Sequence, residues 1–264
     1  MRLAAVGDNC VDVLKPAGRR LIGGNALNVA VQFARLGGCS TYFGAVGQDG
    51  DGARVRKTLV TYGVGVEHLV ERARPTARTD IEIGPGGERR IVFEDFGPCA
   101  GYAPDAAAFE ALASADHVHI GWLDDRGALR RRLAAGGRSA SQDLTVNAAH
   151  ENVGVDGLAI AFASAAGSHQ AAWRLAQSLF ARGALGVVVT RGGQGSSVFL
   201  DGVEEEIPAQ PIEPVDTTGA GDAYIAAFLH AWLSGAHPAT AGGSAAAHAA
   251  RACLHEGGFP QNEE

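Results

Sequence analysis

Residues 216–228 read DTTGAGDAYIAAF, and this stretch indicates how the chain folds more sharply than any other part of the sequence. Gly219, Ala220 and Gly221 carry almost no side chain and stand at the start of an amphipathic helix that we expect over residues 220–233. A helix start presents free backbone N–H groups, and small residues let a phosphate approach them closely. The stretch therefore predicts an anion site at a helix N-terminus.

Asp222 follows in the first turn of this helix, and two interpretations compete for it. A carboxylate there complements the helix dipole, which contributes about 0.3–1 kcal/mol. Alternatively it accepts the proton of an attacking hydroxyl, an effect of about 10²–10⁴-fold in rate. Two glycines where helices usually carry neither favour the phosphate site. The helix N-terminus should lower the pKa of Asp222, which would make it a weaker base.

Two N-terminal segments carry polar residues at a helix start and after a strand, which are positions where ligands often bind. Residues 23–28 read GGNALN and open a helix that ends near residue 37, so Gly24 and Asn28 serve either as helix-capping residues or as part of a polyol site. Asp12 follows the first predicted strand, residues 3–6. Open α/β sheets bind ligands beyond such strand ends, although a lone Asp there is also a common turn residue.

Residues 188–195, VVTRGGQG, resemble a glycine-rich dinucleotide fingerprint only superficially. The fingerprint requires a helix after the glycines, whereas residues 196–200 are typical of a strand. A Thr and glycines at a strand end that border a nucleotide fit this segment better, which makes Thr190, Gly192 and Gly195 the candidates.

Strands and helices alternate along most of the chain, which predicts a largely parallel sheet with helices on both faces in a single domain, residues 1–264. Residues 186–190 are expected to form a central strand. A hairpin over 78–96 with a turn at 84–87 forms a small sheet with the segment after residue 11, and a second hairpin covers 197–207. We expect one helix that opens at residues 23–24 and ends at residues 37–38. A polar turn over residues 47–52 leads into a second helix through about residue 62, and further helices are expected over residues 124–135, 169–182, 220–233 and 238–254.

Composition excludes several classes of protein. The 264 residues are 46% apolar with a net charge of −7, which argues against a nucleic-acid partner. The chain has no run of 18 apolar residues for a membrane span, and we expect no secretory signal. The four cysteines form no CxxC pair, so we expect a reducing cytoplasm rather than disulfides or zinc. Neither lysine stands in GxxxxGK[ST], which excludes a Walker P-loop. His117 and His119 are expected to be packing residues or residues at the edge of a sheet.

These segments, in this order, resemble the PfkB (ribokinase-like) carbohydrate kinase family over nearly the whole chain. GGNALNVA is similar to the family's N-terminal signature, and DTTGAGDAYIAAF is similar to its C-terminal signature. GDNCVDV, GGNALNVAVQFARLG and FASA are similar to the fructoselysine 6-kinase branch. A nicotinamide-dependent oxidoreductase does not fit, because the first strand and helix lack a glycine-rich turn.

The resemblance implies a three-layer α/β/α domain with a small β-sheet lid from about residues 11–22 and 78–96. It implies ATP as phosphoryl donor with Mg²⁺, a monovalent cation such as K⁺, and a homodimer formed through the lid. By resemblance Asp222 is the base. The remaining implied roles are an anion hole from the amides of Gly219, Ala220 and Gly221, a sugar site of Asp12, Gly24 and Asn28, and an ATP site of Thr190, Gly192 and Gly195.

One departure concerns magnesium. Most members carry an NxxE motif where residues 163–168 read ASAAGS. Magnesium keeps several waters and is often held mainly by substrate phosphates, so this loss need not abolish activity. Asp143, on a middle strand, is expected to face the phosphates. Arg78, Glu82 and Arg90 of the lid are candidates for contact with an amino-acid group, or are solvated hairpin residues.

The sequence therefore predicts an ATP-dependent kinase that phosphorylates a primary hydroxyl of a sugar or of a fructosamine such as fructoselysine. A kinase for another sugar or a nucleoside remains open, with fructose, ribose and 2-keto-3-deoxygluconate as examples. A non-catalytic sugar-binding or regulatory protein is the alternative from another class, and the missing NxxE motivates it. The expected partners are small molecules and a second copy of the chain, with no nucleic acid and no membrane.

Overall fold

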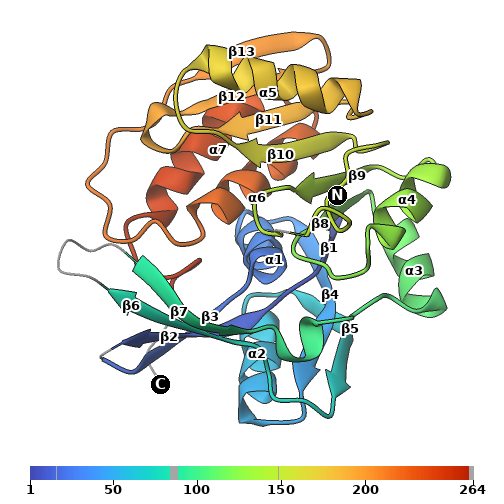
Figure 1. Ribbon diagram of the computed structural model, residues 1–264, viewed down its shortest axis with the longest axis vertical. Coiled ribbons are helices and arrows are strands. Elements are labelled where there is room, and N and C mark those ends of the chain that lie inside the picture. Colours follow the sequence, from blue (N-terminus) through green and yellow to red (C-terminus); the bar gives the residue numbers. More distant parts are fainter. Residues whose placement is uncertain (16, 84–88, 148, 262–264) are drawn as a thin grey trace.

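The computed structural model describes residues 1–15, 17–83, 89–147 and 149–261. Its larger sheet contains β1 (Arg2–Val6), β4 (Cys39–Gly47), β5 (Gly65–Arg72), β8 (His117–Ile120), β9 (Ala140–Asp143), β10 (Ile160–Ser164), β11 (Val187–Thr190), β12 (Ser196–Leu200) and β13 (Val203–Ile207). The strand order is β13-β12-β11-β10-β9-β8-β1-β4-β5 (Figure 1). All neighbouring strands from β11 to β5 are parallel to each other. Strand β12 is antiparallel to both of its neighbours, β11 and β13. The predicted parallel sheet is confirmed, but β11 lies third from one edge rather than at the centre.

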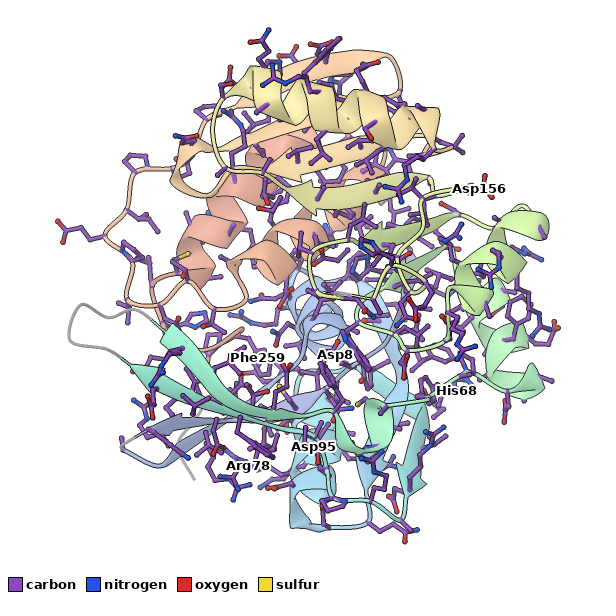
Figure 2. All side chains as sticks on the ribbon, viewed as in Figure 1. Asp8, His68, Arg78, Asp95, Asp156 and Phe259 are labelled. Atoms are coloured by element: carbon purple, nitrogen blue, oxygen red, sulfur yellow. The ribbon has the colours of Figure 1, made fainter. Side chains whose placement is uncertain are left out.

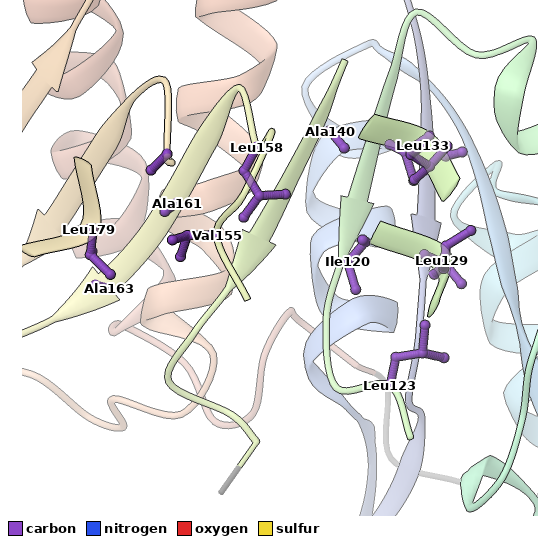
Figure 3. Close-up of a cluster of buried hydrophobic side chains, with 14 of the residues drawn as sticks. Ile120, Leu123, Leu129, Leu133, Ala140, Val155, Leu158, Ala161, Ala163 and Leu179 are labelled. Carbon is purple, nitrogen blue, oxygen red and sulfur yellow. The ribbon is translucent and has the colours of Figure 1, made fainter. Parts of the chain in front are cut away.

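Helices cover both faces of this sheet, as predicted. They are α1 (Asn25–Arg35), α2 (Gly50–Thr61), α3 (Ala106–Ala113), α4 (Ala128–Ala135), α5 (His169–Ala181), α6 (Ala220–Leu233) and α7 (Pro238–Ala252). Helices α3, α4 and α5 share one apolar core with the sheet, part of which Figure 3 shows. Helices α1, α2, α6 and α7 pack on the other face. Among the described residues, no helix combines the length and the apolar character that crossing a bilayer requires.

The helix expected from residue 124 begins four residues later, at Ala128. Asp125 accepts hydrogen bonds from the backbone N–H groups of Gly127 and Leu129, at 2.8 and 2.7 Å. Gly127 adopts a left-handed conformation with φ 70°. The segment before Ala128 is therefore a turn that Asp125 stabilises, rather than a helical turn.

A smaller sheet projects from the main body beside α2 (Figure 1). It contains β2 (Cys10–Lys15), β3 (Arg19–Gly23), β6 (Arg78–Ile83) and β7 (Arg89–Asp95), in the order β3-β2-β6-β7. Strands β2 and β6 are parallel, and the other two pairs are antiparallel. The hairpin expected over 78–96 thus joins the segment after residue 11, while its predicted turn at 84–87 lies outside the described residues.

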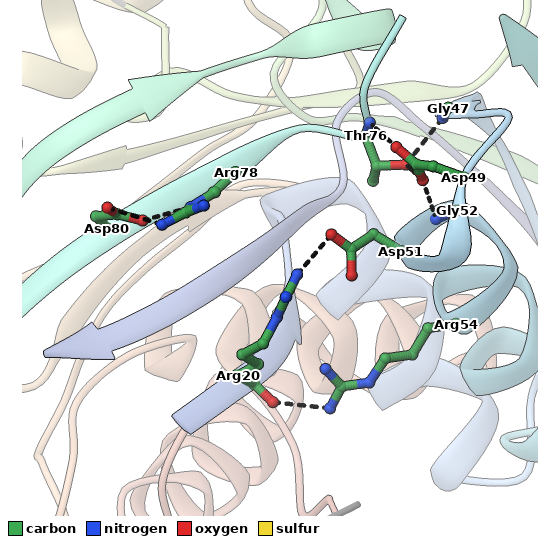
Figure 4. Close-up of polar contacts among 9 residues, drawn as sticks. All are labelled: Arg20, Gly47, Asp49, Asp51, Gly52, Arg54, Thr76, Arg78 and Asp80. Carbon is green, nitrogen blue, oxygen red and sulfur yellow. Dashed lines mark hydrogen bonds and ion pairs between the residues drawn. The ribbon is translucent and has the colours of Figure 1, made fainter. Parts of the chain in front are cut away.

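Polar contacts fix the base of this small sheet to α2 (Figure 4). Asp49 caps α2 by accepting from the Gly52 N–H at 2.8 Å, and it also accepts from the N–H and hydroxyl of Thr76, which leads into β6. Arg20 of β3 forms an ion pair with Asp51 at 2.5 Å. The sheet is therefore anchored at its α2 end.

The segment after α7 connects the small sheet to the body. The Gln261 side chain bonds both backbone groups of Ile22 in β3, at 2.8 and 2.7 Å. Phe259 (Figure 2) is fully buried. Its ring packs edge to face against the ring of Tyr62. The Gly258 carbonyl accepts from Gln32 of α1 at 2.6 Å. This chain end thus holds β3 and α1 in a fixed relation.

Candidate active site

Three carboxylates meet where α1 begins, at the edge of the large sheet to which the parallel strands point. Asp8 follows β1, Asp143 ends β9, and Asp222 lies in the first turn of α6. Figure 2 shows Asp8 near the middle of the molecule, just above the small sheet. Open α/β sheets bind ligands beyond the carboxyl ends of their strands, so this cluster occupies the expected place for a site.

Two asparagines of α1 hold the Asp222 carboxylate. Asn28 Nδ2 donates to Asp222 Oδ2 at 2.7 Å, and Asn25 Nδ2 donates to Asp222 Oδ1 at 2.5 Å. Asn25 also donates to Asp143 Oδ2 at 2.9 Å. The structure therefore brings Asn28, Asp143 and Asp222 together. Asn25 received no role from the sequence, although its place three residues before Asn28 puts both on one helix face.

The acidity of Asp222 differs from the expectation. Burial raises the pKa of Asp222 to about 8, and the charges of Asp143 and Asp8 add to this, while the Asn28 and Asn25 amides act in the opposite direction. The lowered pKa expected from the helix N-terminus is thus wrong, because loss of water around the carboxylate outweighs the helix dipole. A carboxylate with a pKa near neutral is a far stronger base than an ordinary one.

Asp8 stabilises the N-terminus of α1. Its two carboxylate oxygens accept from the backbone N–H groups of Asn25 and Ala26, at 3.0 and 3.1 Å. Burial raises the pKa of Asp8 to about 6 despite these bonds. Gly24 precedes the helix at φ 110°, and a Cβ there would lie 2.4 Å from Asn9 Cα. Close packing therefore explains Gly24, and its contact with a sugar stays a prediction.

The loop before α6 is tightly built. Gly219 has φ 73°, and a Cβ there would lie 2.4 Å from Gly258 Cα. Asp216 accepts from the Thr218 N–H at 2.9 Å and from the Gly257 N–H at 2.7 Å. The Ala220 N–H donates to the Thr217 carbonyl at 3.2 Å. Gly221 is exposed and faces open space. An anion at this helix start would thus compete with one turn bond, and the anion hole stays a prediction.

The predicted nucleotide residues lie at the end of β11. Thr190 Oγ1 donates to the Ala163 carbonyl at 3.4 Å, and Gly192 begins a short 3-10 turn. Gly195 has φ 91°, and a Cβ there would lie 2.0 Å from the Ile207 carbonyl oxygen, so only glycine fits. Ser196, the next residue, is hydrogen-bonded to Tyr224 of α6 at 2.8 Å. This segment therefore adjoins the helix that carries Asp222.

The two faces of the small sheet carry different predicted residues. Residues directly paired across strands share a face, so Asp12, which pairs with Thr79, lies on the face opposite Arg78 and Asp80. Arg78 binds Asp80 through two bonds of 2.6 and 3.1 Å, and Lys15 lies 2.7 Å from the same carboxylate.

Arg90 donates to Glu82 at 2.5 Å on the Arg78 face, and 74% of its side chain is exposed. The structure thus separates Arg90, a candidate for contact with an amino-acid group, from Asp12 of the predicted sugar site, because successive residues of a strand point to opposite faces.

Residues 163–168, which lack NxxE, lead into α5, where Ser168 caps the helix. Across the described ranges there is no cluster of three His, Cys, Asp or Glu side chains suited to a metal ion.

Two histidines of β8 behave as predicted. His117 and His119 are fully buried and hydrogen-bonded to Ser141, at 2.8 and 2.9 Å. Burial lowers the pKa of each to about 3, which keeps the rings neutral. Their role as packing residues is confirmed.

Comparisons with known proteins agree with this architecture. The model of the pfkB family carbohydrate kinases matches residues 3–151 and 153–263. The chain is 35% identical to fructoselysine 6-kinase of Shigella flexneri over 88% of this chain and 90% of that one, and 31% identical to a nucleoside kinase of Methanothermobacter thermautotrophicus over 90% and 80%. Ribokinase of Arabidopsis thaliana, solved with ribose and ATP, superposes with a TM-score of 0.85 at 20% identity, covering 97% and 93%. The chain belongs to the pfkB family of carbohydrate kinases.

Proposed function

We propose that this kinase transfers the γ-phosphoryl group of ATP to a primary hydroxyl of a sugar or of a fructosamine such as fructoselysine. The observation that carries the proposal is Asp222 itself. It lies at the N-terminus of α6, both of its oxygens accept from asparagine amides, and burial raises its pKa to about 8. A base of this strength suits removal of a hydroxyl proton at neutral pH.

In the proposed step, Asp222 accepts the proton of the acceptor hydroxyl while the hydroxyl oxygen forms a bond to the γ-phosphorus. The bond from that phosphorus to the bridging oxygen of ATP breaks, and ADP leaves. The amides of Gly219, Ala220 and Gly221 would hold the transferred group. Mg²⁺ bound to ATP would neutralise charge on the phosphate oxygens.

The remaining roles follow the same assignment. Asp12, Gly24 and Asn28 would bind the sugar, and Thr190, Gly192 and Gly195 would border ATP. Closure of the small sheet over the sugar would exclude water, which otherwise competes as acceptor. A monovalent cation such as K⁺ is also proposed. A cytoplasmic location is also proposed.

A fructosamine is the preferred substrate because the chain is 35% identical to a fructoselysine 6-kinase. A nucleoside is the rival, since a nucleoside kinase is 31% identical. Arg78 and Arg90 are already paired with Asp80 and Glu82, so an amino-acid carboxylate would have to compete for them.

We also propose a homodimer formed through the small sheet. The edge strand β7 exposes three consecutive apolar residues, Ile91, Val92 and Phe93, at 59%, 40% and 50%. An exposed apolar edge strand invites pairing with another chain. We expect a dimer in size-exclusion chromatography at micromolar concentration and a monomer for Phe93→Glu. A monomeric wild type would contradict this assignment.

The test of the function is ADP release with Mg-ATP against fructoselysine, other fructosamines, fructose, ribose, 2-keto-3-deoxygluconate and nucleosides, with and without K⁺. Asp222→Asn should reduce kcat for the preferred acceptor by about 10²-fold or more. Asp156→Asn, at an exposed aspartate elsewhere on the surface (Figure 2), should keep full activity. Absence of turnover with every acceptor, combined with sugar binding by calorimetry, would favour a non-catalytic sugar-binding protein.

A further inference from the structure

Asn25, the first residue of α1, joins two carboxylates at the centre of the site. Its Nδ2 lies 2.5 Å from Asp222 Oδ1 and 2.9 Å from Asp143 Oδ2, so each amide hydrogen has a carboxylate acceptor. The side chain is buried. A single amide thus links the start of α6 to the end of β9, two elements that lie far apart in the sequence.

The surroundings hold this amide in one orientation. The backbone N–H of Asn25 donates to Asp8 Oδ2 at 3.0 Å, which fixes the start of the helix. A Cβ at Gly121 would lie 2.5 Å from Asn25 Oδ1, so glycine leaves room for the amide oxygen. A flipped amide would turn that oxygen toward Asp143 and Asp222, where two acceptors would repel it. The carboxylates therefore require the N–H groups between them.

The arrangement has a consequence for Asp222. Two neighbouring carboxylates repel each other, and N–H donors between them favour the charged forms. Asn28 holds the second oxygen of Asp222 at 2.7 Å, so an amide restrains each oxygen and the carboxylate plane cannot turn freely. Small displacements of a reacting group are costly, up to about 10²-fold in rate for about 1 Å.

We propose that Asn25 is the positioning residue for Asp222, directing its carboxylate toward the acceptor hydroxyl while reducing its repulsion from Asp143. The inference rests on the proposed function, in which Asp222 is the base. The titratable groups that face Asp222 are Asp143 at the end of β9 and Asp8 in the loop after β1. Asn25 acts on the reaction through these carboxylates.

Two substitutions separate this role from simple packing. Asn25→Leu has nearly the same size and removes both donors. Asn25→Ser keeps one donor, which can serve a single carboxylate. The matched control is Asn152→Leu, because Asn152 is also a buried amide that donates to a carboxylate, Asp124, at 3.2 Å. Thermal melts establish that each variant is folded.

The decisive readout is the ¹³C NMR titration of the aspartate carboxyl groups, with the Asp222 signal assigned by its loss in Asp222→Asn. We expect the Asp222 midpoint to rise by about one pH unit or more in Asn25→Leu, less in Asn25→Ser, and not at all in Asn152→Leu. In ADP release, kcat should fall by about 10²-fold in Asn25→Leu while KM for the sugar stays unchanged.

A folded Asn25→Leu or Asn25→Ser with the wild-type midpoint and kcat would overturn the proposal. Equal losses of activity in Asn25→Leu and Asn152→Leu, with an unmoved midpoint, would also overturn it. A wild type without kinase activity whose Asp222 midpoint still rises in Asn25→Leu would support the positioning role and refute the proposed function instead. The titration therefore distinguishes failure of the inference from failure of the function.

Discussion

The raised pKa of Asp222 makes the pH dependence of phosphoryl transfer a direct test of its role as base. Burial moves this pKa from 3.8 to about 8, which corresponds to about 6 kcal/mol in favour of the neutral carboxyl. At pH 7 roughly one molecule in ten then carries the ionised base. We therefore expect kcat to rise about tenfold per pH unit below pH 8 and to level off above it.

The assay is initial ADP release at saturating Mg-ATP and sugar, from about pH 6 to about pH 9.5 at constant ionic strength. A phosphate monoester loses its second proton near about pH 6, so ionisation of the nucleotide would give a limb about two units lower. A profile that is flat across this range, or one whose only limb lies near that lower pH, would refute the assignment of Asp222 as a base tuned by burial.

Three further predictions concern stability. The pKa of Asp222 is higher in the folded state than in the unfolded state, so the wild type loses stability as pH rises from 3.8 to about 8, and Asp222→Asn should become more stable relative to it. Urea titrations of both proteins at the two ends of this pH range measure the difference in free energy of unfolding. A difference that does not change with pH would contradict the prediction. For His119 the pH dependence of stability runs the other way. Its pKa in the folded state, about 3, lies below the ordinary 6.5, so the unfolded state takes up the proton first. The free energy of unfolding of the wild type should therefore fall by about 1.4 kcal/mol per pH unit relative to His119→Phe as pH drops below 6.5. Gly195→Ala should lower the free energy of unfolding by about 1–3 kcal/mol, because residue 195 has φ 91° and the new Cβ would lie 2.0 Å from the Ile207 carbonyl oxygen. Gly193→Ala is the control, because a Cβ there would face open space. Equal melting temperatures for the two variants would contradict this explanation.

Local sequence patterns predicted the elements whose ends carry their own signals. Helix α6 runs over Ala220–Leu233, as expected, because glycine precedes it and Ser234-Gly235 ends it. Strand β5 and helix α3 were not predicted from the sequence. Strand β5 is an edge strand with mostly exposed or half-buried residues, so it lacks a strong apolar alternation, and α3 is only eight residues long.

The candidate site divides in the same way. The sequence by itself indicated the family and the helix N-terminus, and it singled out Asp222 and Asn28 as candidates, since small residues and polar side chains at strand and helix ends are visible locally. Only the tertiary structure decided that Asn25 bridges Asp143 and Asp222, and that the pKa of Asp222 rises instead of falling. The physical reason is that desolvation and charge repulsion depend on which distant segments meet, and no single segment carries that information.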